Sequence, residues 1–216
     1  VNKGLEYSRL SEGAFDITIG KVSDLWNFQE MDDKGNRIGV IPEESVISEA
    51  MSHVDYNCVV IEDNTIRLTD PAAELDLGGI AKGYIADKVA EFLEAKGVTS
   101  AVVDLGGNIV VIGEKGESID NPVGTEFKVG IADPNSEGLL GLLECKDKTV
   151  VTSGTYERYF ELDGKRYHHV LDTKTGYPAD TDLLAVTIVA DKGHSVDCDG
   201  LSTSCLALGK EKGLKL

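Results

Sequence analysis

The stretch Asp76-Leu77-Gly78-Gly79-Ile80-Ala81-Lys82-Gly83-Tyr84 decides the fold of this chain, because three glycines crowd the entry to a segment that reads as a helix. Apolar residues then recur at helical spacing, at Ile85, Val89, Phe92 and Leu93. Gly97 is placed to end this helix, so the helix N-terminus falls at the glycine cluster. Unpaired N–H groups at such an end attract anions. The stretch therefore predicts a place where the backbone approaches a phosphate closely.

The bulk composition limits the partners of the chain. Its 216 residues are 41% hydrophobic, enough to bury a core as one large domain or as two closely joined halves, and one compact α+β unit is the simplest prediction. It carries 38 acidic against 21 basic residues, a formal charge of −17, with no run of Lys and Arg. This balance argues against nucleic acid and anionic membrane surfaces as partners. The simplest interpretation is a well-solvated surface, and any anionic ligand would need the helix entry or a divalent cation.

Four cysteines lack the paired C-x-x-C spacing of a zinc site and are few for a disulfide scaffold: Cys58, Cys145, Cys198 and Cys205. We expect mostly buried thiols. The chain starts at Val1 without a signal peptide or a bilayer-spanning apolar run, which fits a cytoplasmic protein and a trimmed exported one equally.

Short apolar runs predict strands around tight turns. Residues 101–103 and 109–112 flank a glycine turn at 104–108, and residues 127–131 and 184–189 read as further strands. The most specific signal is Asp163-Gly164 between two alternating runs, which predicts a β-hairpin because this dipeptide tolerates positive φ.

Residues 195–209 predict a second helix, with Leu201, Cys205 and Leu208 on one face and Gly209 as its terminator. Asp199 and Thr203 are four residues apart, so a carboxylate and a hydroxyl project from the same face one turn apart. Two oxygens placed in this way suit Mg²⁺, which completes its octahedron with water and substrate phosphate. Spacing alone favours the other interpretation, in which Asp199 caps the helix and the Thr203 hydroxyl bonds to its own backbone.

Adjacent histidines on the second hairpin strand, His168 and His169, must face opposite sides, so only one of them can reach a given cleft. Histidine titrates near neutrality and suits a general base. A structural histidine held by Asp172, or a surface one, is an equally good interpretation. Ser153, His169 and Asp172 could also be combined into a catalytic Ser-His-Asp triad, but no nucleophile-elbow pattern around the serine supports this interpretation.

Two further segments have two interpretations each. Gly13-Ala14-Phe15-Asp16 offers an aromatic ring and a carboxylate to a flavin or nucleotide base, although such a phenylalanine is more often core. Thr152-Ser153-Gly154 is either a strand-end turn or a phosphate-side loop.

Taken in order, these segments resemble the ApbE family of FAD:protein FMN transferases, which attach FMN to a threonine of a partner flavoprotein. Several short motifs match the family in the same order over nearly the whole chain, which is hard to obtain by chance. The matching blocks lie at residues 13–16 with Gly20 and 25–26, 75–84, 104–108, 152–154, 156–159, 167–172, 175–178 and 199–203.

The resemblance implies an α+β, T-fold-related architecture of mixed sheets packed with helices. It also implies FAD as substrate, Mg²⁺ at the FAD pyrophosphate and a threonine-bearing acceptor flavoprotein, with AMP released. The metal ligands would be Asp199, Thr203 and the backbone carbonyl of Ala81, and His169 would be the base. The residues matching flavin contacts are Ala14, Phe15, Asp16, Gly78, Lys82, Tyr84, Ser153 and His169.

Members of the family usually carry a further N-terminal portion and more chain after the last helix. We therefore expect residues 1–216 to be a single ApbE-like domain truncated at both ends, extracytoplasmic and lipid-anchored in its full-length form. FAD hydrolysis to FMN and AMP, and flavin binding without catalysis, are the alternatives. The products formed from FAD, Mg²⁺ and an acceptor distinguish all three.

Overall fold

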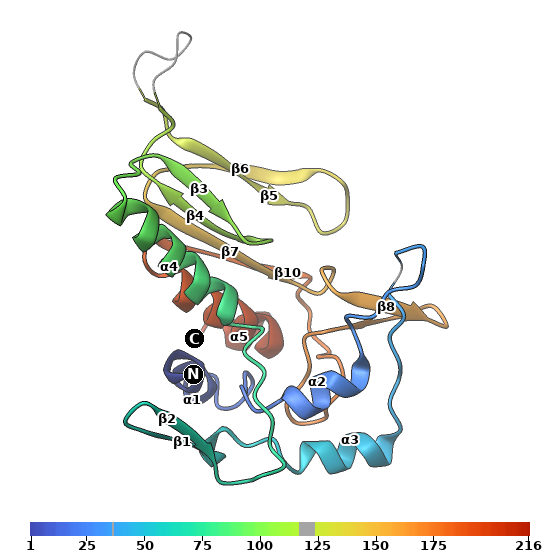
Figure 1. The fold of residues 1–216 in the computed structure, drawn as a ribbon. Helices are drawn as coiled ribbons and strands as arrows, with labels where there is room; N and C mark the ends of the chain where they lie inside the picture. Colours follow the sequence, from blue (N-terminus) through green and yellow to red (C-terminus); the bar gives the residue numbers. More distant parts are fainter. Residues whose placement is uncertain (36, 117–123) are drawn as a thin grey trace. The chain divides into compact units, whose positions relative to one another are not determined.

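The computed structural model describes residues 1–35, 37–116 and 124–216, and these fall into two compact units. Unit 1 comprises Val1–Leu77, Thr155–Leu184 and Thr203–Leu216, and unit 2 comprises Gly78–Gly154 and Ala185–Ser202. Both units mix helices with antiparallel strands, which confirms the α+β prediction, whereas a single domain over 1–216 stays a prediction (Figure 1). Within the described residues, no helix has both the length and the apolarity needed to cross a membrane.

A four-stranded antiparallel sheet in the order β10-β7-β4-β3 forms the centre of unit 2. Its strands are β3 (Ala101–Asp104), β4 (Asn108–Ile112), β7 (Lys148–Gly154) and β10 (Ala185–Asp191). The predicted glycine turn joins β3 to β4, with Gly106 and Gly107 at φ of +68° and +82°. The other two strands of this unit, β5 (Phe127–Ala132) and β6 (Leu139–Cys145), form a separate two-stranded ribbon.

Alternation along β4 builds two apolar layers, one on each face of this sheet. Val110 and Ile112 pack with Val103 against Ala86 and Ala90 of helix α4 (Ala81–Ala95). The residue between them, Val111, packs on the opposite face against the β5–β6 ribbon (Figure 1). The alternation places successive side chains on opposite faces, so one apolar strand serves both layers.

Helix α4 begins and ends where the sequence predicts, and Val89 and Leu93, two of its four predicted apolar positions, pack against the core. Gly97 follows it at a φ of +85°. The side chains of Ile85 and Phe92 are 49% and 61% exposed, and the buried residues are Gly83, Ala86, Asp87 and Ala90. The prediction was wrong for Ile85 and Phe92, and the fully buried positions are mostly small residues, which allow the helix to pack closely on its neighbours.

Helix α5 (Ser195–Gly213) confirms the second predicted helix and breaks at Gly209, whose φ is +75°. The boundary between the units falls within it, after Ser202. Leu201, Cys205 and Leu208 are only partly buried. The fully buried positions Cys198, Ser202 and Leu206 lie on another face of the helix, which the apolar pattern missed because one of them is a serine.

Unit 1 holds the remaining elements around an aromatic core. They are α1 (Asn2–Leu10), α2 (Gly20–Trp26), α3 (Glu44–Met51), η1 (Tyr56–Cys58), β1 (Val59–Glu62), β2 (Thr65–Leu68), β8 (Tyr159–Leu162) and β9 (Lys165–His168). Trp26 is fully buried, lies 5.8 Å from the Tyr167 ring, and donates its Nε1–H to the Gly176 carbonyl at 2.9 Å. Phe160 stacks on Tyr167 at 5.2 Å. The core thus connects α2 with the β8–β9 hairpin.

The β8–β9 hairpin confirms the Asp163-Gly164 prediction, with φ of +52° and +75° at the two turn residues. Its strands present different faces. Phe160 and Tyr167 enter the aromatic core, while the alternate positions Arg166 and His168 point the other way.

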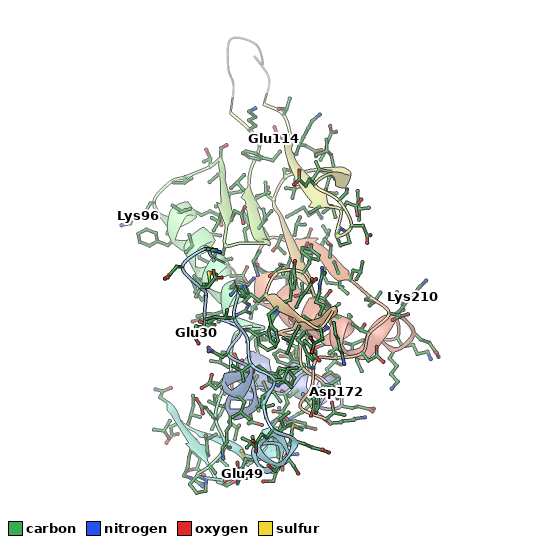
Figure 2. The ribbon with its side chains drawn as sticks, turned by 90° about the vertical axis from the view of Figure 1, so that its right-hand side faces the viewer. Glu30, Glu49, Lys96, Glu114, Asp172 and Lys210 are labelled. Carbon is green, nitrogen blue, oxygen red and sulfur yellow. The ribbon has the colours of Figure 1, made fainter. Side chains whose placement is uncertain are left out.

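Most acidic residues lie on the surface, as the composition predicted. Figure 2 shows Glu49 on the outside of unit 1, where its carboxylate pairs with Lys21 at 2.9 Å. Among the residues that the structure describes, the buried acids are Asp16, Asp87 and Asp199. All four cysteines are free thiols, three of them buried, which confirms that prediction as well.

Replacing Trp26 with alanine should lower the free energy of unfolding by about 3–5 kcal/mol, because it empties the aromatic core and leaves the Gly176 carbonyl without its donor. Urea unfolding followed by far-UV circular dichroism measures this. Phe92→Ala, at a residue 61% exposed, is the control and should cost less than about 0.5 kcal/mol. Equal costs for the two variants would contradict the proposed core.

Candidate functional site

The helices α4 and α5 cross at Gly83, inside unit 2. A Cβ atom at Gly83 would lie 2.3 Å from the Ser195 carbonyl oxygen and 2.7 Å from Val196 Cα, far inside contact distance. Only a residue without a side chain allows the two backbones to meet here. The glycine of the opening stretch therefore has a role in packing as well as in the loop.

Asp87 holds the first turn of α5. Its two carboxylate oxygens accept the backbone N–H groups of Ser195 and Val196, each at 3.0 Å. A helix N-terminus has unpaired donors and a partial positive charge, so a carboxylate there is stabilising. In this case the cap comes from α4 rather than from a neighbouring residue in sequence.

Asp199 connects the same two helices in the opposite direction. Its Oδ2 accepts the Gly83 N–H at 2.9 Å, and the residue is 3% exposed. This contact confirms the prediction that the C-terminal helix and the glycine-rich loop converge. Burial raises the pKa of Asp199, although the Gly83 hydrogen bond and the charge of Lys82 act against this.

Three further hydrogen bonds gather the predicted motifs of unit 2 around this crossing. Lys82 Nζ donates to the Gly106 carbonyl at 3.1 Å, and Thr152 N–H donates to the Gly107 carbonyl at 2.8 Å. The Ser153 hydroxyl lies 2.8 Å from the Ser202 hydroxyl on α5. The glycine turn, the end of β7 and both helices therefore lie together, as their order in the motif pattern suggested.

Asn108 adds a buried polar group to this cluster. It is fully buried, and its Oδ1 accepts the Ser195 hydroxyl. Its Nδ2 has no hydrogen-bond partner among the described residues. A buried amide without a hydrogen-bond partner lowers stability by about 1–3 kcal/mol. The hydrogen-bonding groups of this cluster are therefore incompletely paired.

The oxygens for a cation are few but chemically suitable. Ala81 begins α4, two residues before the Gly83 N–H that binds Asp199, and Thr203 follows Asp199 by one helical turn. In the described ranges, no group of three or more His, Cys, Asp or Glu side chains could hold a metal ion. Carboxylate, carbonyl and hydroxyl oxygens are the types that suit a hard cation, and the roles of Asp199, Ala81 and Thr203 as its ligands stay a prediction.

The predicted flavin contacts Ala14, Phe15 and Asp16 lie in unit 1. Phe15 is 7% exposed, so most of its ring is in the core. Asp16 accepts hydrogen bonds from Thr18 N–H at 2.8 Å, from the Thr18 hydroxyl at 2.7 Å and from Tyr56 N–H at 3.0 Å. Burial raises the pKa of Asp16 against these bonds. Its carboxylate therefore orders the local backbone, and a role toward flavin stays a prediction.

His169 and Tyr84 are the remaining predicted contacts. His169 is partly buried, with Nδ1 3.1 Å from the Arg158 carbonyl oxygen. Tyr84, on α4, is 55% exposed, with Lys88 Nζ 5.8 Å from its ring centroid. Their roles, like that of Gly78 in the loop before α4, stay predictions.

Sequence reasoning missed Asp87, Asn108 and Ser195. The signal for Asp87 was present, because it lies on the small-residue face of α4 between Ala86 and Ala90, where an acid needs a buried partner. Asn108 follows the glycine turn at the start of β4, a position that reads equally as a turn residue.

Comparisons with known proteins agree with the motif pattern. The model of the ApbE family matches residues 1–216. A FAD:protein FMN transferase from Treponema pallidum is 38% identical over 100% of this chain, and one from Klebsiella pneumoniae is 37% identical over 95%. The crystal structure of an ApbE protein from Thermotoga maritima matches 96% of this chain at a TM-score of 0.82 and 33% identity. The flavin transferase ApbE from Vibrio cholerae matches 99% at a TM-score of 0.81 and 28% identity.

These relatives are longer than this chain. The chain spans 60% of the length of the Treponema and Klebsiella proteins. It covers 63% and 65% of the Thermotoga and Vibrio chains.

Gly83→Ala should destabilise the protein by about 1–3 kcal/mol through overpacking, although alanine is the better helix former. The matched control is Gly141→Ala on β6, where an added Cβ meets nothing within 4 Å, and it should change stability by less than about 0.5 kcal/mol. Urea unfolding of both variants measures the difference. If Gly83→Ala were as stable as the wild type, the close crossing of α4 and α5 would be refuted.

Proposed function

The chain belongs to the ApbE family, and from this membership we propose that it transfers the FMN moiety of FAD to a threonine hydroxyl of an acceptor flavoprotein, releasing AMP, with Mg²⁺ as cofactor. The names of its relatives support flavin transfer. The single structural observation that carries the proposal is the buried Asp199 carboxylate bonded to the Gly83 N–H at the entry to α4.

The surroundings of Asp199 fit a divalent cation. A carboxylate that is 3% exposed and has a raised pKa is costly to keep ionised, and a bound cation would offset that cost. We propose Asp199, Thr203 and the Ala81 carbonyl as its ligands. When bound, Mg²⁺ would offset the charge on the pyrophosphate oxygens and stabilise the leaving AMP.

The entry to α4 supplies the phosphate contacts in this proposal. In the described part of the chain, the N-cap residue Ile80 makes no side-chain cap, and Asp199 accepts the Gly83 N–H. The other backbone donors at the start of this helix are the ones we propose for the phosphates. Gly78 and Lys82 flank them. Backbone N–H groups and one ammonium would hold the pyrophosphate in a protein that otherwise repels anions.

His169 would accept the proton in the transfer step. The acceptor threonine Oγ forms a bond to the FMN-side phosphorus, the bond from that phosphorus to the AMP-side oxygen breaks, and the threonine proton moves to the histidine. A hydrogen bond from Nδ1–H to the Arg158 carbonyl gives the tautomer in which Nε2 is the accepting nitrogen.

The remaining assignments rest on the resemblance alone. We propose Ala14, Phe15, Asp16, Tyr84 and Ser153 as further flavin contacts. We also propose an extracytoplasmic, lipid-anchored location for the full-length protein.

Asp199→Asn should abolish covalent flavin transfer, because the amide removes the only charged ligand of the proposed cation. The assay incubates the protein with FAD, Mg²⁺ and a threonine-bearing acceptor and measures acceptor-bound flavin fluorescence after denaturing electrophoresis. The control is Asp197→Asn on the same helix, whose carboxylate pairs with exposed His194 at 3.1 Å and whose activity should stay within about twofold of wild type. Free FMN and AMP without labelled acceptor would instead indicate hydrolysis, and intact bound FAD would indicate a carrier.

The same variant should be more stable than the wild type at pH 7 when Mg²⁺ is absent. A carboxyl whose pKa is raised in the folded state costs stability above that pKa, and the cost disappears as the pH falls through it. The gain in Asp199→Asn should therefore vanish in acid, and added Mg²⁺ should raise the melting temperature of the wild type only. Thermal unfolding from pH 4 to 7 tests this, and a variant that is less stable at pH 7 would count against it.

A further inference from the structure

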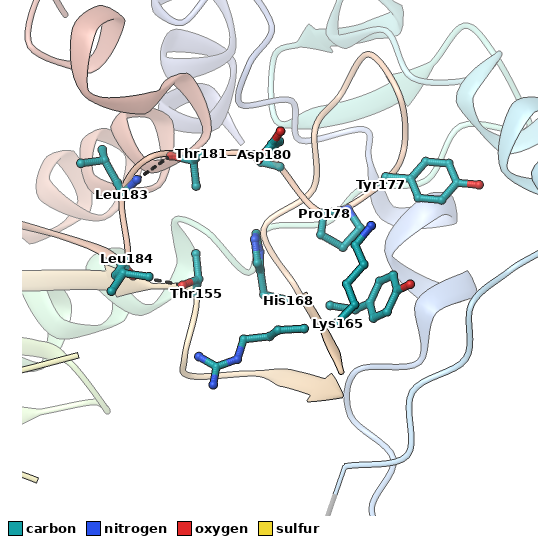
Figure 3. A pocket seen from close by; sticks show the side chains of 12 residues that line it. Thr155, Lys165, His168, Tyr177, Pro178, Asp180, Thr181, Leu183 and Leu184 are labelled. Atoms are coloured by element: carbon teal, nitrogen blue, oxygen red, sulfur yellow. Dashed lines mark hydrogen bonds between the residues drawn. The ribbon is translucent and has the colours of Figure 1, made fainter. Parts of the chain in front are cut away.

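Unit 1 contains a pocket that the proposed reaction does not use. It has a volume of about 400 Å³, within the range of small-molecule sites. Its wall comes from β9, from Thr155 and from residues 177–181 and 183–184, and Figure 3 shows His168 in the middle of these residues. Tyr177, Pro178 and Leu183 give it an apolar side.

His168 is the buried polar group of this pocket. Its residue is 9% exposed, and Nδ1 has no hydrogen-bond partner among the described residues. Figure 3 shows the imidazole between Thr155 and Pro178, directed into the pocket. Burial lowers the pKa of His168 below its usual value and the charge of Arg166 adds to this, whereas the backbone groups of Ala179 and Val170 act against it, so the ring is neutral at pH 7. A buried, unpaired ring nitrogen is costly and gains from a ligand that pairs with it.

Arg166 provides the charge that a ligand would meet. It shares the outer face of β9 with His168, two residues away. Glu161 accepts Nε–H at 3.3 Å and one Nη2–H at 3.1 Å, which leaves three of the five guanidinium N–H groups for another acceptor.

The other charges on the pocket wall are Lys165 and Asp180. Lys165 lies 5.2 Å from the Tyr167 ring centroid and has no carboxylate partner in the described part of the chain. Glu161, paired with Arg166, and Asp180 balance the charges of Arg166 and Lys165, so the pocket has no net charge in a chain of charge −17. The three remaining guanidinium N–H groups of Arg166 are therefore the feature that favours an anion in this pocket.

We propose that this pocket binds a small organic carboxylate with a flat apolar body, its carboxylate bonded to Arg166 and to His168 Nδ1 and its body against Tyr177, Pro178 and Leu183. Pairing the carboxylate with the ring makes the Nδ1–H tautomer and the protonated ring more favourable. The ligand thus satisfies the unpaired nitrogen while the apolar wall excludes water from the contact.

Benzoate is the probe, added to the full chain while the His168 ring is followed by NMR. Saturable benzoate binding should shift the His168 ring resonances and raise the pKa of His168, because an anion beside the ring favours its charged form. Benzamide, a neutral molecule of the same shape, and inorganic phosphate, an anion without an apolar body, should both bind more weakly.

Arg166→Gln should weaken benzoate binding at least about tenfold, which corresponds to the loss of one charged hydrogen bond. The matched control is Arg67→Gln on exposed strand β2, which should leave binding unchanged. The Arg166 side chain is 42% exposed, so its variant should keep the fold. His168→Phe places a ring without nitrogen atoms in the pocket and should abolish binding.

Three results would overturn the proposal. They are unchanged His168 resonances, equal benzoate affinity in Arg166→Gln, and benzamide binding as tightly as benzoate. Competition between FAD and benzoate would overturn it as well, by assigning the pocket to flavin. Flavin transfer that fails while benzoate binding holds would count against the proposed function and leave this site intact.

Discussion

The contact between α4 and α5 at Gly83 is the constraint on which the candidate site of unit 2 depends. The absent side chain lets the first turn of α5 approach the α4 backbone, and Asp87 then satisfies two donors of that turn. The same approach lets the Gly83 N–H reach Asp199. A bulkier residue would separate the helices and break these three hydrogen bonds together, so packing and candidate chemistry share one physical cause.

The three buried acids show how the surroundings decide what a carboxylate can do. Asp16 accepts three hydrogen bonds from Thr18 and Tyr56, and Asp87 accepts two from the N-terminus of α5. Both therefore hold backbone in place. Asp199 receives one such bond at 3% exposure, so its charge is the least compensated by hydrogen bonds. Such an acid is unfavourable for stability alone, which is a common property of residues kept for function.

The two faces of the β8–β9 hairpin have different roles, because successive side chains of a strand point to opposite sides. Tyr167 completes the aromatic core around Trp26, and the next residue, His168, faces a pocket on the other side. His169 follows the strand end and lies against the Arg158 carbonyl. Two adjacent histidines thus have unrelated environments, and the pocket beside His168 is a feature that the order of motifs did not indicate.

The sequence by itself determined the α+β class, the two long helices, the Asp163-Gly164 hairpin and the family, because periodicity, turn chemistry and motif order are local properties read along one chain. It also predicted that Asp199 and the glycine loop converge. Only the tertiary structure decided which face of α4 is buried, that Asp87 caps α5, and that Asn108 and His168 have unpaired buried nitrogens. These depend on contacts between residues about 10 to more than 100 positions apart, whose distances follow from packing and from no local pattern.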